Sequence, residues 1–117
     1  MSGYRTSSEH AARSNHTRGR ALDFRITGVP NRVLYEALRR SFAGVGVGYY
    51  PNSTFVHLDV RESDATWIDY AGPNDPACYS RRVQHDLATG DADRLSLEEA
   101  RRAGCRQRAR ATGRETP

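Results

Sequence analysis

The chain has 117 residues, a length that allows one small domain with a modest core. Apolar residues make up 37% of it and the mean hydropathy is −0.78, and no apolar run approaches the ~20 residues of a membrane span. No apolar segment of a signal peptide follows Met1. We therefore expect neither a membrane span nor a leader in this sequence.

The formal net charge is +4, and all 18 basic residues are arginine. Six of these arginines lie in the last seventeen residues, so the basic character belongs mainly to the C-terminal end. Arginines alone give salt-sensitive, non-specific attraction to nucleic acid, and this segment has no aromatic side chains for stacking on bases. We therefore expect no nucleic-acid partner and interpret this segment as a solvated extension.

Residues 6–13 are short and polar, which is consistent with a helix or a helical turn. Residues 20–26 alternate, with Leu22, Phe24 and Ile26 on one face and Asp23 on the other, as the two-residue period of a strand requires. After a turn, Pro30 suits the start of a helix. Apolar residues then recur at helical spacing from position 33 to position 42, which predicts an amphipathic helix of about three turns.

Two further strands are expected. Residues 44–50 predict a turn that leads into a glycine-rich strand, and residues 51–53 a hairpin-like connection. Residues 54–60 predict a strand with Phe55, His57 and Asp59 on one face and apolar residues on the other. The order of elements predicts a small α+β domain, with an antiparallel sheet and flanking helices.

The signals fade after position 71. We expect a domain at 1–71, followed at 72–117 by a linker and an arginine-rich, flexible tail. Ser96 and Glu99 predict a capping box at the start of one short helix. Cys78 and Cys105 are interpreted as two unrelated surface thiols, although they could form one disulfide in an oxidising compartment.

Three residues form a candidate metal site, because two histidines and one aspartate are a ligand set that leaves a catalytic zinc one open position. His16 precedes the first strand, Asp23 lies on the polar face of that strand, and His57 lies on the polar face of the third. If the two strands pair, Asp23 and His57 converge. The spacing also arises by chance, and Asp23 could instead pair with Arg20 or Arg25.

The residues around this set follow an ordered pattern: SGYRT at 2–6, SxHxxGxAxD at 14–23, GVGYY at 46–50, FVHLD at 55–59, and Trp67. The pattern resembles the zinc D-alanyl-D-alanine carboxypeptidase family (M15-like peptidases), most closely its small branch of bacterial cell-wall peptidase-like domains. The resemblance covers positions 2–67. It implies a zinc domain of the hedgehog/DD-peptidase type, and an N-terminally truncated one, since family members have a segment before SGYR.

The resemblance also implies roles. His16, Asp23 and His57 would bind Zn²⁺, and Ser14 would support the loop that carries His16. Arg5 would orient the substrate and stabilise charge on the attacked carbonyl.

One position departs from the family pattern. Many members have an acidic residue or a histidine as general base three positions before the last ligand, where this chain has Thr54. Asp59 is the nearest substitute. It could act either as the base or as a residue that orients a ligand.

The function implied is a zinc-dependent metallopeptidase that hydrolyses peptidoglycan stem peptides next to a D-amino acid, as a D,D-carboxypeptidase or an endopeptidase. The alternative is an inactive member of the same fold that binds zinc or cell-wall peptide. A peptidoglycan substrate implies the cell envelope, the periplasm or the outside of the cell.

Overall fold

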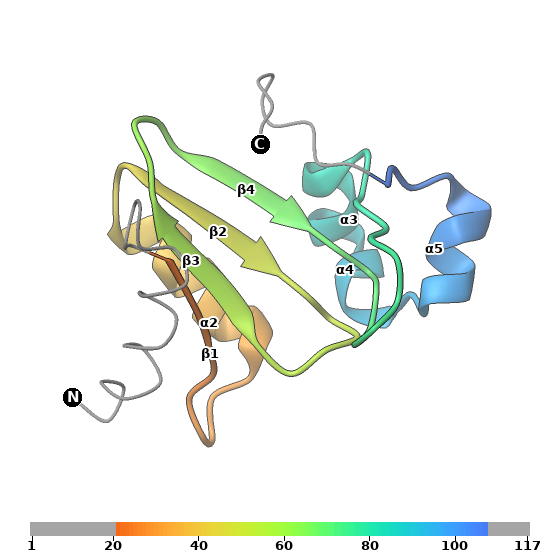
Figure 1. Ribbon diagram of the computed structural model, residues 1–117, viewed down its shortest axis with the longest axis horizontal. Helices are drawn as coiled ribbons and strands as arrows, with labels where there is room; N and C mark the ends of the chain where they lie inside the picture. The colour runs from red at the N-terminus through yellow and green to blue at the C-terminus, as the bar shows by residue number, and fades with distance from the viewer. Residues whose placement is uncertain (1–20, 108–117) are drawn as a thin grey trace.

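The computed structural model describes residues 21–107, which form one four-stranded sheet and four helices (Figure 1). The α+β class is confirmed. The expected helix at 6–13 lies outside the described residues. In chain order the elements are β1 (Ala21–Phe24), α2 (Asn31–Ser41), β2 (Val45–Tyr49), β3 (Val56–Val60), β4 (Ala65–Ile68), α3 (Val83–Thr89), α4 (Asp91–Arg94) and α5 (Leu97–Ala103).

The sheet has the order β1-β3-β2-β4. The three expected strands pair antiparallel, with β3 between β1 and β2. The fourth strand, β4, was not expected, and it pairs parallel to β2, so the sheet is mixed and not wholly antiparallel. Both edges of β3 are already paired, with β1 and with β2, so β4 adds to the free edge of β2. Since β4 and β2 both run opposite to β3, they are parallel to each other.

The core lies between the sheet and helix α2. Val47 and Tyr49 of β2 and Leu34 and Tyr35 of α2 are buried together, and the two tyrosine rings stack with their centroids 5.3 Å apart. Side chains alternate along a strand, so Gly46 and Gly48 of β2 face the opposite side of the sheet. This opposite side, here called the open face, is the one that carries His57 and Asp59.

The structure describes the segment predicted as linker and tail, 72–117, up to residue 107. This part holds α3, α4 and α5, gathered beside the end of the sheet (Figure 1). Cys78, Ala92 and Ala100 are buried in the same core as α2 and the sheet. Whether residues 1–71 fold as a unit of their own stays a prediction.

A disulfide joins Cys78 to Cys105, so the interpretation of two unrelated surface thiols is wrong. Cys78 is fully buried, which neither sequence spacing nor local composition could indicate. The capping box predicted at α5 is confirmed, with the Ser96 hydroxyl accepting from the Glu99 N–H and the Glu99 carboxylate accepting from the Ser96 N–H. No helix in residues 21–107 is long and apolar enough to cross a membrane.

Candidate metal centre

The register of the sheet brings two of the predicted ligands together. Asp23 of β1 lies directly opposite His57 of β3, so both side chains project from the open face. His57 Nδ1 is 2.8 Å from Asp23 Oδ1. The expected convergence of Asp23 and His57 is therefore observed. The Asp23 side chain is 54% exposed, so this end of the site is accessible from solvent.

The His57 ring is held between two carboxylates. Its other nitrogen, Nε2, lies 2.8 Å from Asp59 Oδ2, and its side chain is only 21% exposed. Burial disfavours the charged ring, but the hydrogen bonds and charges of Asp23 and Asp59 outweigh burial and raise the pKa of His57 to about 9. Without a metal ion the ring is therefore an imidazolium that donates to both aspartates near neutral pH.

Asp59 has a second partner, the fork-shaped guanidinium of Arg61. Arg61 Nε donates to Asp59 Oδ1 at 2.6 Å and its terminal nitrogen donates to Oδ2 at 3.1 Å. Burial favours the neutral acid, but the bonds from His57 and Arg61 prevail and lower the pKa of Asp59 to about 2. Asp59 is thus ionised and fully engaged, whereas an efficient general base has a pKa near the working pH.

Aromatic side chains border the histidine on the side away from Asp23. The Trp67 and His57 rings have centroids 5.4 Å apart, and Trp67 Nε1 donates to the Tyr50 hydroxyl at 2.9 Å. The Tyr50 ring in turn packs against Phe55 at 4.7 Å. His57 therefore lies between an accessible carboxylate and an apolar border, which shields one side of the ring from water.

The two described donors, Asp23 and His57, fit a zinc ion. Two atoms bound to one tetrahedral zinc at ~2.0–2.2 Å lie roughly 3.3–3.6 Å apart, close to the 2.8 Å that separates His57 Nδ1 from Asp23 Oδ1. With Nδ1 as the ligand atom, Nε2–H would still donate to Asp59, an arrangement typical of metal-bound histidines. The third predicted ligand, His16, lies outside the described residues, as do Arg5 and Ser14.

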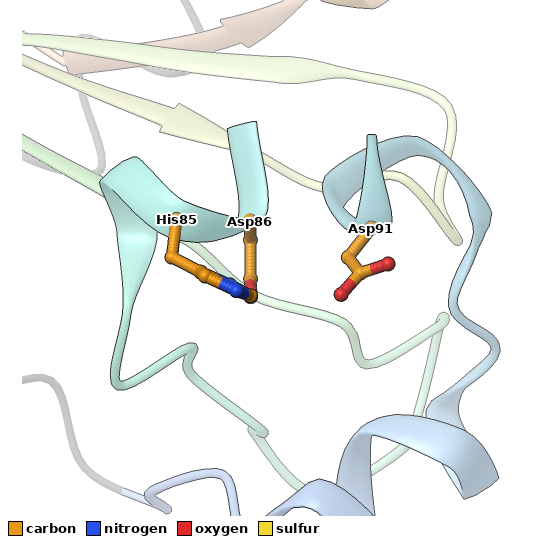
Figure 2. Close-up of side chains that lie close together, drawn as sticks. All are labelled: His85, Asp86 and Asp91. Atoms are coloured by element: carbon orange, nitrogen blue, oxygen red, sulfur yellow. The ribbon is translucent and has the colours of Figure 1, made fainter. Parts of the chain in front are cut away.

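A second group of ligand-type side chains lies away from the sheet, on α3 and at the start of α4 (Figure 2). Potential ligand atoms of His85, Asp86 and Asp91 are within 4.8 Å of one another. Asp86 Oδ2 already accepts from the Tyr70 and Ser80 hydroxyls at 2.7 and 2.8 Å. Its Oδ1 faces His85 at 3.3 Å, and Asp91 pairs with Arg94. These contacts connect α3 to the segment after β4, which accounts for the cluster structurally.

The sequence analysis used Trp67 and the two glycines of β2 only as parts of the family pattern, and it did not single out Arg61. All four lie on the open face beside His57. A signal was present, because glycines two residues apart in a strand share one face and often mark a close approach by another group. The approach of Trp67 to Gly48 could not be known without β4, the strand that carries Trp67.

Comparison with known proteins identifies the segment that carries this site. The family model described as peptidoglycan L,D-endopeptidase MepK matches residues 3–67. The peptidoglycan L,D-endopeptidase MepK of Escherichia coli strain K12 is 45% identical over 69 aligned positions, and the match covers 50% of this chain and 37% of that protein. The probable peptidoglycan L,D-endopeptidase MepK of Haemophilus influenzae is 42% identical over 67 aligned positions, and the match covers 49% of this chain and 36% of that protein.

The chain therefore spans little more than a third of the length of these curated relatives. No solved structure matches. The matched segment ends at Trp67, so it includes Asp23, His57 and Asp59 but none of the three helices after β4.

Proposed function

Since the chain belongs to the M15 peptidase family, we propose that it is a zinc-dependent peptidase that cleaves peptidoglycan stem peptides at a bond next to a D-amino acid. The observation that carries the proposal is the 2.8 Å approach of Asp23 to His57 Nδ1, inside the segment that matches the family. Peptidases of this family are generally metal-dependent. Both relatives are described as peptidoglycan L,D-endopeptidases, which favours an endopeptidase over a D,D-carboxypeptidase, the other activity that the resemblance implies.

In this proposal, His16, Asp23 and His57 hold the metal. Zinc held by these residues would polarise the scissile carbonyl and would supply a nucleophile at neutral pH by lowering the pKa of water. Arg5 binds the substrate and offsets charge on the attacked carbonyl. His57 must lose a proton before Nδ1 can bind metal, so loading the site releases protons.

Asp59 is assigned an orienting role in the proposal. The carboxylate accepts from His57 Nε2 and from the Arg61 fork, and its pKa is lowered to about 2. A carboxylate so strongly stabilised in its ionised form is a poor proton acceptor at neutral pH. It does fix the tautomer and the plane of a ligating imidazole.

The envelope location is proposed as well. The supporting observation is the disulfide between Cys78 and Cys105, because disulfides persist in oxidising compartments such as the periplasm and are rare in the cytosol. Peptidoglycan, the substrate named for the relatives, lies outside the cytoplasm.

The alternative is a member of the fold that binds metal or peptide without cleaving it. The observation that favours it is Thr54, an exposed residue that cannot accept a proton, at the position where many family members have the base. Both the peptidase and the non-cleaving alternative would bind zinc, so only an assay of peptide cleavage distinguishes them.

The test measures zinc and cleavage on the full chain. We expect about one zinc per chain in the wild type, loss of zinc in His57→Ala, and retention in His85→Ala, a matched histidine control from the α3 cluster. The same proteins are incubated with muropeptides that carry L,D or D,D cross-links and with peptides that end in D-Ala-D-Ala. Cleavage of the L,D cross-link alone supports the endopeptidase. Zinc without any cleavage supports the alternative, and a folded wild type without zinc contradicts the proposal.

A further inference from the structure

Two glycines of β2, Gly46 and Gly48, lie on the open face beside the candidate metal centre. Gly46 is paired with Asp59 and Ala65, and Gly48 with His57 and Trp67, so a row of side chains crosses the sheet at each glycine. Both glycines are buried although neither has a side chain. Side chains from the neighbouring strands therefore lie over β2 itself.

Trp67 occupies the place above Gly48. A Cβ at Gly48 would come within 2.5 Å of the indole Cε2, so the ring rests directly on the backbone of β2. The hydrogen bond from Nε1 to the Tyr50 hydroxyl fixes the ring in its plane. In this position the indole contacts two groups, the His57 ring at 5.4 Å and the Arg61 guanidinium, which lies 4.9 Å from the ring centroid.

Arg61 occupies the place above Gly46. A Cβ there would meet Arg61 Nε and would lie 2.6 Å from Asp59 Oδ1. The guanidinium lies over the Trp67 ring and donates its two hydrogen bonds to the Asp59 carboxylate. The contacts thus run without a gap from Tyr50 through Trp67, Arg61 and Asp59 to His57.

We propose that Arg61 and Trp67, seated on Gly46 and Gly48, are positioning residues of the peptidase site. They fix the Asp59 carboxylate, and Asp59 fixes the His57 ring so that Nδ1 faces Asp23. The inference rests on the proposed function, since it assigns what holds the ligand in place. Neither residue touches the reacting atoms.

We expect a displacement of Arg61 or Trp67 to change metal binding and kcat more than substrate binding. Partners one step removed from a metal ligand typically change metal affinity or activity by 10–100-fold when they are replaced. A lysine at position 61 keeps the charge but has neither the fork nor the flat surface that stacks on an indole. An alanine at position 48 keeps every polar group of the site but displaces the indole.

The test uses Arg61→Lys, Arg61→Gln and Gly48→Ala, with Arg40→Gln on the exposed side of α2 and Gly90→Ala as matched controls. Gly90 has a positive φ of 88° and open space around its Cβ position, so alanine there strains the fold without entering the site. Zinc affinity is measured by chelator competition, and kcat and KM on an L,D-cross-linked muropeptide. Trp67 is the single tryptophan of the sequence, so its fluorescence in metal-free protein reports whether the indole still packs against Gly48.

We expect Arg61→Gln and Gly48→Ala to weaken zinc affinity or lower kcat by about 10–100-fold, with KM within about twofold and with altered Trp67 emission. Arg61→Lys should recover only part of the loss. Wild-type zinc affinity and kcat in folded Arg61→Gln and Gly48→Ala would overturn this inference alone. A wild type that neither binds zinc nor cleaves overturns it together with the proposed function. If Gly48→Ala does not fold, Trp67→Leu, which needs no extra space, takes its place, with zinc affinity and kcat as its readouts because it has no tryptophan left.

Discussion

The pairing of His57 with two aspartates predicts an unusual pH dependence for the stability of the metal-free protein. The pKa of His57 is raised from 6.5 to about 9 by folding. Each pKa unit corresponds to about 1.4 kcal/mol, so the pairing contributes roughly 3 kcal/mol to the free energy of unfolding. The lowered pKa of Asp59 reflects part of the same pairing and is not added to this figure.

The sign follows from where the proton is bound. Below pH 6.5 the ring is protonated in the folded and the unfolded chain, so the full contribution is present. Between pH 6.5 and about 9 the unfolded chain releases the proton while the folded protein keeps it, so stability falls as pH rises. Above about pH 9 the contribution is gone. Asp59, with a pKa of about 2, does not titrate in this window.

The assay is urea denaturation of chelator-treated protein at a series of pH values from 5.5 to 9.5, for the wild type and for His57→Gln. The difference in unfolding free energy between the two should shrink by roughly 3 kcal/mol across the window, while titration of all other groups cancels. Excess zinc should reverse the trend in the wild type, because metal binding requires the deprotonated ring. A difference that stays constant with pH would refute the argument.

Three other changes test the rest of the described fold. Replacing Cys78 and Cys105 with serine should lower stability by ~3.5 kcal/mol, since their separation of 27 residues sets the loop that the disulfide closes; urea unfolding measures the loss, and reductant should then have no further effect. Tyr70→Phe removes one donor from the buried Asp86 carboxylate and should cost about 1–3 kcal/mol, which thermal unfolding would show; an unchanged midpoint would mean that Ser80 satisfies Asp86 alone. Ser96→Ala should cost about 1 kcal/mol by removing the cap of α5, and hydrogen exchange should speed up at this helix, whereas uniform exchange would contradict a local effect.

Much of the sheet could be predicted because local pattern determines which face a residue lies on. The two-residue period places Asp23 on the polar side of its strand, and the same period places His57 on the polar side of β3. The spacing of apolar residues predicts α2, and Ser96 with Glu99 predicts the start of α5. These features depend on neighbours within a few positions, so the sequence alone is enough to find them.

The register, by contrast, is a property of the whole sheet. A slip of one residue between β1 and β3 would turn Asp23 away from His57, and only the combined packing of the strands and α2 excludes it. The same holds for β4, whose pairing with β2 brings Trp67 over Gly48. The arrangement of residues 72–107 also depends on long-range contacts, because a disulfide joins Cys78 to Cys105 across 27 positions.

The amino-acid pattern is thus enough to show which chemistry-bearing residues share a face and which family pattern they follow. The three-dimensional fold is needed to show that Asp23 meets His57 at Nδ1, that Asp59 is held by Arg61, and that glycines make room for both Arg61 and Trp67. Faces follow from the local period of a strand, whereas contacts between strands follow from pairing and packing that residues far apart in the chain establish together.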